Sequence, residues 1–177
     1  MLMRRLVRGV TLIEMLIGLV VLALLMSLAV PSFMVWMQNT RIRNAADAVL
    51  NGMQIARAEA IRRNKPVQFA LTNQSDWRVT IVKPSATETN PIQTRSAAEG
   101  SANVNVTATP GGAYAVTFDA MGGPTGNLDG SVGIGSLQFT SQVSDPAIRT
   151  LNIVISVSGT IRMCDPNVAA SDPRSCT

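Results

Sequence analysis

The sequence of 177 residues contains no histidine and only two cysteines, Cys164 and Cys176. Serine and cysteine nucleophiles are usually activated by a histidine, so the common nucleophilic arrangements are excluded and we predict no enzyme activity. A zinc site needs about four Cys, His or carboxylate ligands close together, and the sequence offers no such group. We therefore predict no metal and no cofactor, which favours a structural or binding role.

Charged residues are also missing from Met15 to Thr40, a run of 26 positions. Because about 20 apolar residues suffice for a helix to span a bilayer, this run predicts a transmembrane helix. Arg4, Arg5 and Arg8 precede it, and basic residues tend to stay on the cytoplasmic side. Glu14 stands at the edge of the run, where a carboxylate is disfavoured. It either lies just outside the bilayer or has a partner.

An ordinary secretory signal is an alternative interpretation of the same segment. Ser27-Leu28-Ala29 has the small residues of a signal-peptidase site and follows an apolar stretch. Under this alternative the hydrophobic segment is removed, the mature chain begins at Val30, and the secreted protein is soluble.

The basic character of the chain, with an overall pI of about 9.8, is unevenly distributed. A chain that begins at Val10 has 12 basic and 11 acidic side chains. Residues 41–65 contain 6 basic and 2 acidic side chains, whereas residues 66–177 contain 6 basic and 8 acidic ones. The excess of basic over acidic side chains therefore lies in the first nine residues and in residues 41–65. This distribution argues against a nucleic-acid-binding function inferred from the pI alone.

Apolar residues beyond Pro31 recur at spacings of three and four, which predicts one buried helical face. This face consists of Ile42, Ala46, Val49, Met53, Ala56 and Ala60. Asn64-Lys65-Pro66 is typical of a helix end. The pattern predicts one helix from about Val10 to Asn64, with its first half in lipid and its amphipathic second half packed on a domain.

After Pro66 the pattern changes to short segments rich in Val, Ile, Thr and Phe, separated by turn-forming residues. The predicted strands are Val67–Leu71, Trp77–Lys83, Val104–Ala108, Ala113–Phe118, Ser136–Thr140 and Leu151–Val157. Ser85–Ser101 is expected to be a mobile loop. Short strands without intervening helices predict an antiparallel sheet, and the long helix on one face makes the fold class α+β.

Cys164 and Cys176 predict a disulfide if this part of the chain lies outside the cytoplasm. The alternative is a pair of free thiols. A bond between them closes a loop of about a dozen residues and stabilises the fold by about 3 kcal/mol in the chain-entropy model.

The segment Arg8-Gly-Val-Thr-Leu-Ile-Glu14 resembles the signature of type IV prepilins and pseudopilins. The family usually has Phe where this chain has Val10. The resemblance implies that prepilin peptidase cuts after Gly9, that Val10 is N-methylated, and that Glu14 pairs with an N-terminal amine when subunits pack. An ion pair of this kind would offset the free-energy cost of burying the carboxylate.

A second resemblance narrows the family to GspH/FimT minor pilins and pseudopilins. It rests on Gln54–Val67, where Ala-Arg-Ala-Glu-Ala precedes the first predicted strand, on Val116–Gly122 and on Ser158–Cys164. Arg57 and Glu59 in the first segment are expected to lie on a solvated helix face, without a site role. The expected domains are a leader 1–9, a hydrophobic transmembrane or filament-core helix 10–38, an amphipathic helix half 39–65, and a β-rich head 66–177 with a C-terminal disulfide loop.

The resemblance implies a minor type IV pilin that takes part in initiating or capping pilus assembly. Its expected partners are other pilins, contacted through the N-terminal helix, prepilin peptidase and the inner membrane. The head is expected in the periplasm and then at the pilus or cell surface. A type II secretion pseudopilin of the same fold is one alternative.

A DNA-binding pilin for natural transformation is the other alternative. Some FimT-like members bind DNA through a C-terminal Gly-Arg-x-Arg motif. The corresponding run here is Gly159-Thr-Ile-Arg162, which has only one of the two arginines. Arg162, Arg149 and Arg174 are the candidate DNA contacts. Nearby aspartates make the region close to neutral and no stacking aromatics are present, so DNA binding is not favoured.

Overall fold

The computed structural model describes residues 9–176, apart from the side chain of Leu28. The leader residues before Gly9 lie outside the described part. Within the described residues there is one helix, α1, Leu12–Arg63, which continues through Pro31. The chain is divided into two compact units. The first extends up to Met37, and the second, called the compact unit below, begins at Gln38. The predicted long helix is confirmed.

The C-terminal end of α1 is fixed by local hydrogen bonds. Asn64 adopts a left-handed conformation with φ of 51°. The N–H of Lys65 donates to the carbonyl of Ala60 at 3.2 Å, and that of Asn64 donates to the carbonyl of Ile61 at 3.3 Å. This pair of bonds is the Schellman motif, which satisfies the last carbonyls of a helix. Arg62 and Arg63 in the last turn also suit the negative end of the helix dipole.

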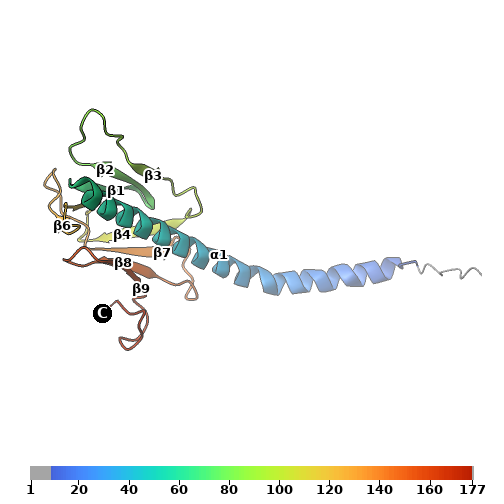
Figure 1. Ribbon diagram of the computed structural model, residues 1–177. Coiled ribbons are helices and arrows are strands. Elements are labelled where there is room, and N and C mark those ends of the chain that lie inside the picture. The colour runs from blue at the N-terminus through green and yellow to red at the C-terminus, as the bar shows by residue number, and fades with distance from the viewer. Residues whose placement is uncertain (1–8, 177) are drawn as a thin grey trace, which may run out of the picture. The chain divides into compact units, whose positions relative to one another are not determined.

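The strands of the compact unit form two antiparallel sheets (Figure 1). The first has the order β3-β2-β1-β5-β6 and the second β4-β7-β8-β9. Their bounds are β1 Val67–Asn73, β2 Asp76–Ile81, β3 Gln93–Arg95, β4 Val104–Thr109, β5 Ala115–Phe118, β6 Pro124–Thr125, β7 Ser136–Ser141, β8 Leu151–Ile155 and β9 Ile161–Cys164. The α+β class is confirmed.

Two expectations about the strands are corrected. One sheet was expected, but two are present, because alternating side chains reveal which face of a strand is buried and not which strand pairs with it. The expected loop Ser85–Ser101 contains β3, which pairs with β2 through Trp77 and Arg95. The turn after β5 includes the short strand β6. Strand β9 lies within the segment Ser158–Cys164 that carried the family resemblance.

The core of the compact unit lies between α1 and both sheets. All six predicted residues of the helical face are at most 1% exposed. They pack in one cluster with aromatic and aliphatic residues of the strands: Phe69, Trp77, Val79, Phe118, Leu137, Phe139 and Ile153. Gly52 of α1 allows the close approach, because a Cβ there would lie 2.9 Å from side-chain atoms of Phe69 and Trp77. Figure 1 shows this half of α1 lying across the strands.

Candidate functional site

The residues on both sides of the predicted cleavage bond lie outside the helix. Gly9 and Val10 have no regular structure and are exposed, Val10 to 65%. Thr11 caps the helix: its Oγ1 accepts a hydrogen bond from the Glu14 N–H at 3.3 Å, and its carbonyl accepts one from Met15 at 3.2 Å. The cap therefore leaves the peptide bond between Gly9 and Val10 in the irregular chain that precedes α1.

Thr11-Leu-Ile-Glu14 has the Ser/Thr-x-x-Glu spacing of a capping box, a signal that the sequence interpretation did not use. Glu14 is in the first turn of α1, where a carboxylate interacts favourably with the helix dipole. Among residues 9–176, no ion pair involves Glu14. In the structure Thr11 therefore acts as the N-terminal cap of α1, a role that the family signature alone does not explain.

The helix that follows is long and apolar enough to cross a membrane, judged by length and composition. Its most apolar 18-residue window has none of its residues buried. Large side chains from Leu12 to Trp36 are exposed, with Leu12 at 80% and Trp36 at 62%. Phe33 and Trp36 form a tilted ring contact with centroids 5.7 Å apart. A soluble chain would leave this much apolar surface in water, so the segment fits an environment of lipid or other subunits.

The C-terminal loop is closed by a disulfide between Cys164 and Cys176, with Cα atoms 5.0 Å apart. The predicted pairing is confirmed. Next to it, the Asp165 N–H donates to the Arg174 carbonyl at 2.7 Å, which extends the pairing beyond β9. Arg162 of β9 also contributes, because its Nη2 donates to the Cys176 carbonyl at 3.1 Å. The last described residues, up to Cys176, are thereby held against the end of the second sheet.

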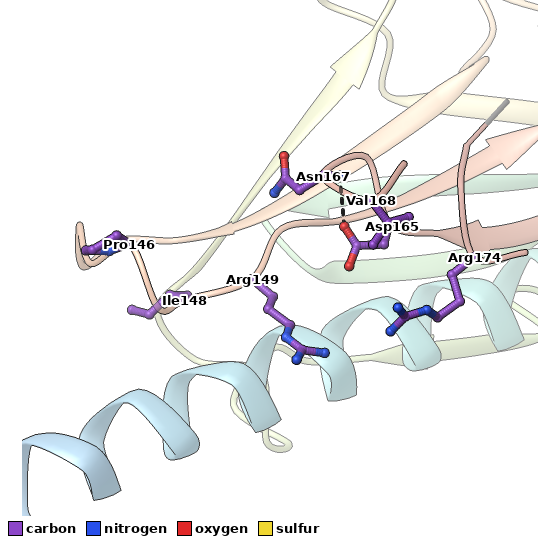
Figure 2. A pocket seen from close by; sticks show the side chains of 7 residues that line it. All are labelled: Pro146, Ile148, Arg149, Asp165, Asn167, Val168 and Arg174. Carbon is purple, nitrogen blue, oxygen red and sulfur yellow. Dashed lines mark hydrogen bonds between the residues drawn. The ribbon is translucent and has the colours of Figure 1, made fainter. Parts of the chain in front are cut away.

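Two of the three candidate DNA-binding arginines line one cavity of about 270 Å³ (Figure 2). Arg149 and Arg174 line it together with Asp165, and Arg162 is not among its residues. The other lining residues are Pro146, Ile148, Asn167 and Val168. The cavity has two cations and one carboxylate within the same small space.

The charge of Arg174 is largely matched by a neighbouring carboxylate. Its Nη2 lies 2.8 Å from Asp172 Oδ2, and its Nε donates to Asp172 Oδ1 at 3.1 Å. These hydrogen bonds lower the pKa of Asp172 to about 2. With Asp165 also present, the surroundings of the two arginines are close to neutral, which is a poor match for a polyanion.

Arg57 corrects the expectation of an ordinary solvated helix face, whereas Glu59 pairs only with neighbouring residues of the same helix. The half-buried Arg57 donates from Nε to the Gly122 carbonyl at 2.9 Å. Glu59 accepts hydrogen bonds from Arg62 and Arg63, each at 2.6 Å, and the bond from Arg62 lowers its pKa. The contact between Arg57 and Gly122 could not be predicted from the sequence, because the two residues are 65 positions apart.

A family model described as type II transport protein GspH matches residues 45–168. The chain belongs to the GspH family. The model of the prokaryotic N-terminal methylation motif matches residues 4–30 and includes Gly9, Val10 and Glu14. The predicted GspH/FimT family is therefore confirmed, and the motif together with the apolar helix fits a membrane-anchored pilin.

Two crystal structures of the type IV minor pilin FimU from Pseudomonas aeruginosa strain PAO1 resemble this GspH-family chain. The first is 17% identical with a TM-score of 0.50, and the match covers 77% of this chain and 95% of that one. The second is also 17% identical, has a TM-score of 0.49 and covers 76% and 99%. At this identity the first likeness shows the fold. A comparison with curated protein sequences finds no match.

The family and its structural neighbours are structural pilins. Within the described residues 9–176, no group of three or more His, Cys, Asp or Glu side chains could hold a metal ion. Asp119 and Asp129, which lie beside glycine-rich turns, bind backbone N–H groups of those turns. Both act as turn-forming residues, as their sequence context predicts.

Proposed function

We propose that this chain is a minor type IV pilin that takes part in initiating or capping pilus assembly. Prepilin peptidase removes residues 1–9, and the new N-terminus at Val10 is methylated. The apolar part of α1 anchors the subunit in the inner membrane with the head in the periplasm, and the same segment packs among other pilins in the filament.

The observation that supports this proposal is the helix cap at Thr11. A protease binds its substrate in an extended form, and the cap keeps Gly9 and Val10 out of the helix that begins at Leu12. Directly after the cap come the exposed apolar residues of α1. The segment thus combines an accessible peptide bond with a helix that needs an apolar environment.

Glu14 is assigned the pairing role in the filament. In a packed bundle of apolar helices its carboxylate would be buried, and an unpaired buried charge is strongly unfavourable. The amine at Val10 of another subunit supplies the opposite charge. The hydrogen bond at 3.3 Å uses the backbone N–H of Glu14 and leaves its carboxylate available for the amine.

The proposal is tested by complementation in a strain that lacks the gene. The wild-type gene and the Asp47→Ala variant are expected to restore surface pili, because the Asp47 carboxylate is 54% exposed and pairs only loosely with Arg43, at 3.7 Å. Glu14→Ala is expected to be processed and to accumulate in the membrane without restoring pili. Normal piliation in the deletion strain, or full restoration by Glu14→Ala, would contradict the proposal.

A type II secretion pseudopilin is the second candidate, because the matching family model is described as a type II transport protein. Such a subunit has the same N-terminal segment and the same fold, so the two roles differ in the apparatus that the subunit joins. Deletion of the gene separates them: loss of pili with normal protein secretion supports the pilus, and loss of secretion with normal pili supports the pseudopilin. Neighbouring genes for one apparatus or the other give an independent answer.

A further inference from the structure

The cavity beside the C-terminal loop has opposite charges on walls that come from two different loops. Arg149 belongs to the segment between β7 and β8, whereas Asp165 and Arg174 belong to the loop closed by the disulfide. In the view of Figure 2 the two guanidinium groups extend towards one another, with the Asp165 carboxylate above them. Ile148 and Val168 add apolar surface. The cavity therefore offers both signs of charge and an apolar wall.

The balance of charge around the cavity disfavours a ligand with only one sign of charge. Asp172 holds Arg174 through contacts of 2.8 and 3.1 Å and is not among the lining residues. Asp172, and more weakly Asp165, raise the pKa of Arg174. Two carboxylates thus match the two guanidinium groups. A simple anion is attracted by the arginines and repelled by the aspartates, and a simple cation meets the reverse, so each gains little.

The charged groups of the cavity retain unused hydrogen-bonding capacity. Among residues 9–176, no ion pair involves Arg149 or Asp165. Asp165 accepts the Asn167 N–H with Oδ1 at 2.9 Å, and no hydrogen bond within these residues reaches its Oδ2. Arg174 uses Nε and Nη2 to bind Asp172, which leaves its Nη1 for another acceptor. The exposed guanidinium of Arg149 is likewise able to bind a ligand.

Both walls of the cavity are held by contacts that do not use these charged groups. Asn39 of α1 accepts the Arg149 N–H with Oδ1 at 2.8 Å, and its Nδ2 donates to the Ala147 carbonyl at 3.3 Å. The other wall is held by the disulfide and by the Asp165 N–H, which donates to the Arg174 carbonyl at 2.7 Å. Because the loops are already ordered, a ligand pays little to order them.

We propose that this cavity binds a small zwitterion, a molecule that has an anionic group, a primary ammonium and an apolar part. The anionic group, a carboxylate or a phosphate, binds the guanidinium of Arg149 and Nη1 of Arg174. The ammonium donates to Oδ2 of Asp165, and the apolar part lies against Ile148 and Val168. A dipolar ligand in this orientation gains at both ends, where a singly charged one gains at neither. The inference rests on the cavity alone and does not depend on the role in pilus assembly.

The size of the cavity limits the ligand to a small molecule. Its volume is about 270 Å³. Pockets for drug-sized ligands begin at about 300 Å³, so this cavity suits a molecule the size of a free amino acid. Arginine binds carboxylates and phosphates alike, so an amino acid and O-phosphoethanolamine represent the two sources of the anionic group.

Isothermal titration calorimetry of the full-length chain in neutral detergent tests the proposal. Leucine is compared with N-acetylleucine, which lacks the ammonium, and with leucinamide, which lacks the carboxylate. Leucine is expected to bind at least about tenfold more tightly than either, because each blocked form loses one charge-assisted hydrogen bond. O-phosphoethanolamine is titrated in a separate arm, and the tighter of the two zwitterions identifies the anionic group. Equal binding of leucine and N-acetylleucine would reveal a simple anion site and would overturn the proposal, as would no binding of either zwitterion.

Two variants assign the binding to the cavity. Arg149→Gln keeps the backbone N–H that bonds to Asn39 and is expected to weaken binding of the preferred zwitterion about tenfold. Asp165→Asn keeps an oxygen for the Asn167 N–H and is expected to remove the preference for leucine over N-acetylleucine.

The matched control is Arg78→Gln, which removes an exposed arginine of β2 outside the cavity and should leave binding unchanged. Thermal unfolding of each variant shows that the fold is retained. Equal weakening by Arg78→Gln and Arg149→Gln, or an unchanged preference for leucine in Asp165→Asn, would overturn the proposal.

Discussion

Arg57 of α1 donates a hydrogen bond from Nε to the carbonyl of Gly122, in the turn after β5, at 2.9 Å. Gly159, between β8 and β9, lies against the same carbonyl. These residues belong to the three segments on which the GspH/FimT resemblance rests. The segments are far apart in the chain and meet at one point, where α1 is joined to a turn from each sheet. The shared motif residues therefore have a structural explanation.

Gly159→Ala is expected to destabilise the compact unit by about 3 kcal/mol or more, from steric overlap and an unfavourable backbone conformation together. A Cβ at this position would collide with the carbonyl oxygen of Gly122, and the φ of Gly159 is 77°. The measurement is the midpoint of denaturant unfolding. Gly111→Ala is the matched control, because a Cβ at that position would have no neighbouring atom within 4 Å. Equal midpoints for Gly159→Ala and Gly111→Ala would contradict the close contact.

The stability of the head is expected to depend on pH through Glu88. Hydrogen bonds from the Ser85 backbone N–H and the Lys65 ammonium lower the pKa of Glu88 from 4.5 to about 2. A lowered carboxyl pKa stabilises the folded state above the unfolded value of 4.5, and this contribution is lost as the pH falls from 4.5 towards 2. Glu88→Gln should therefore lower Tm by a few degrees at neutral pH, with the difference from wild type disappearing in acid.

The control for Glu88 is Glu99→Gln, since Glu99 is 65% exposed and lies 3.7 Å from Arg95. Its Tm should stay close to that of the wild type throughout the titration. Thermal unfolding followed by circular dichroism at several pH values measures both variants. A Tm difference for Glu88→Gln that does not change with pH would show that the lost contact matters for packing and not for charge.

Removal of the disulfide is expected to cost about 3 kcal/mol, the chain-entropy value for a loop of this size. The two cysteines are 12 positions apart. In the double variant Cys164→Ser and Cys176→Ser, hydrogen exchange should accelerate first at the Asp165 N–H, which bonds to the Arg174 carbonyl. A reductant should destabilise the wild type and leave the double variant unchanged. Uniform acceleration over the whole head would contradict a local role for the bond.

DNA binding is expected to be absent in a gel-shift assay of the mature chain at low salt and tens of micromolar protein. The reason is electrostatic: Arg174 is paired with Asp172 at 2.8 Å, and Asp165 lines the same cavity as Arg149. Non-specific DNA affinity depends on several uncompensated cations. Retardation that weakens steeply with salt and is lost in Arg149→Gln or Arg162→Gln would contradict this expectation and support a DNA-uptake pilin.

The helix and its buried face could be predicted because both depend on local periodicity. Spacings of three and four from Ile42 to Ala60 select one side of a helix whatever packs against it, and these residues are at most 1% exposed. The end of the helix at Asn64 could be predicted for the same reason, because its signal lies in the adjacent residues Lys65 and Pro66. Alternation likewise located most strands, but it could not divide them into two sheets, because strand pairing joins distant segments.

The contacts that the sequence did not reveal are long-range ones. Arg57 looks like any helix-surface arginine until Gly122 is known to lie beside it. Strand β3 is only three residues long and depends on its pairing with β2. The cavity unites Arg149 with Arg174 only after Asn39 and the disulfide have placed their two loops. Residue types already indicated a nearly neutral region there, and the fold added that Asp165 lines the same cavity as Arg149 and Arg174.

The N-terminus of the mature protein tests the central claim most directly. The chain is purified from membranes of cells that contain prepilin peptidase, then sequenced from its N-terminus and weighed by mass spectrometry. The account predicts a chain that begins at Val10 with one methyl group on its amine, and a Gly9→Val variant that keeps its leader. A chain that begins at Val30 would show that signal peptidase removes the apolar segment, and would contradict the account.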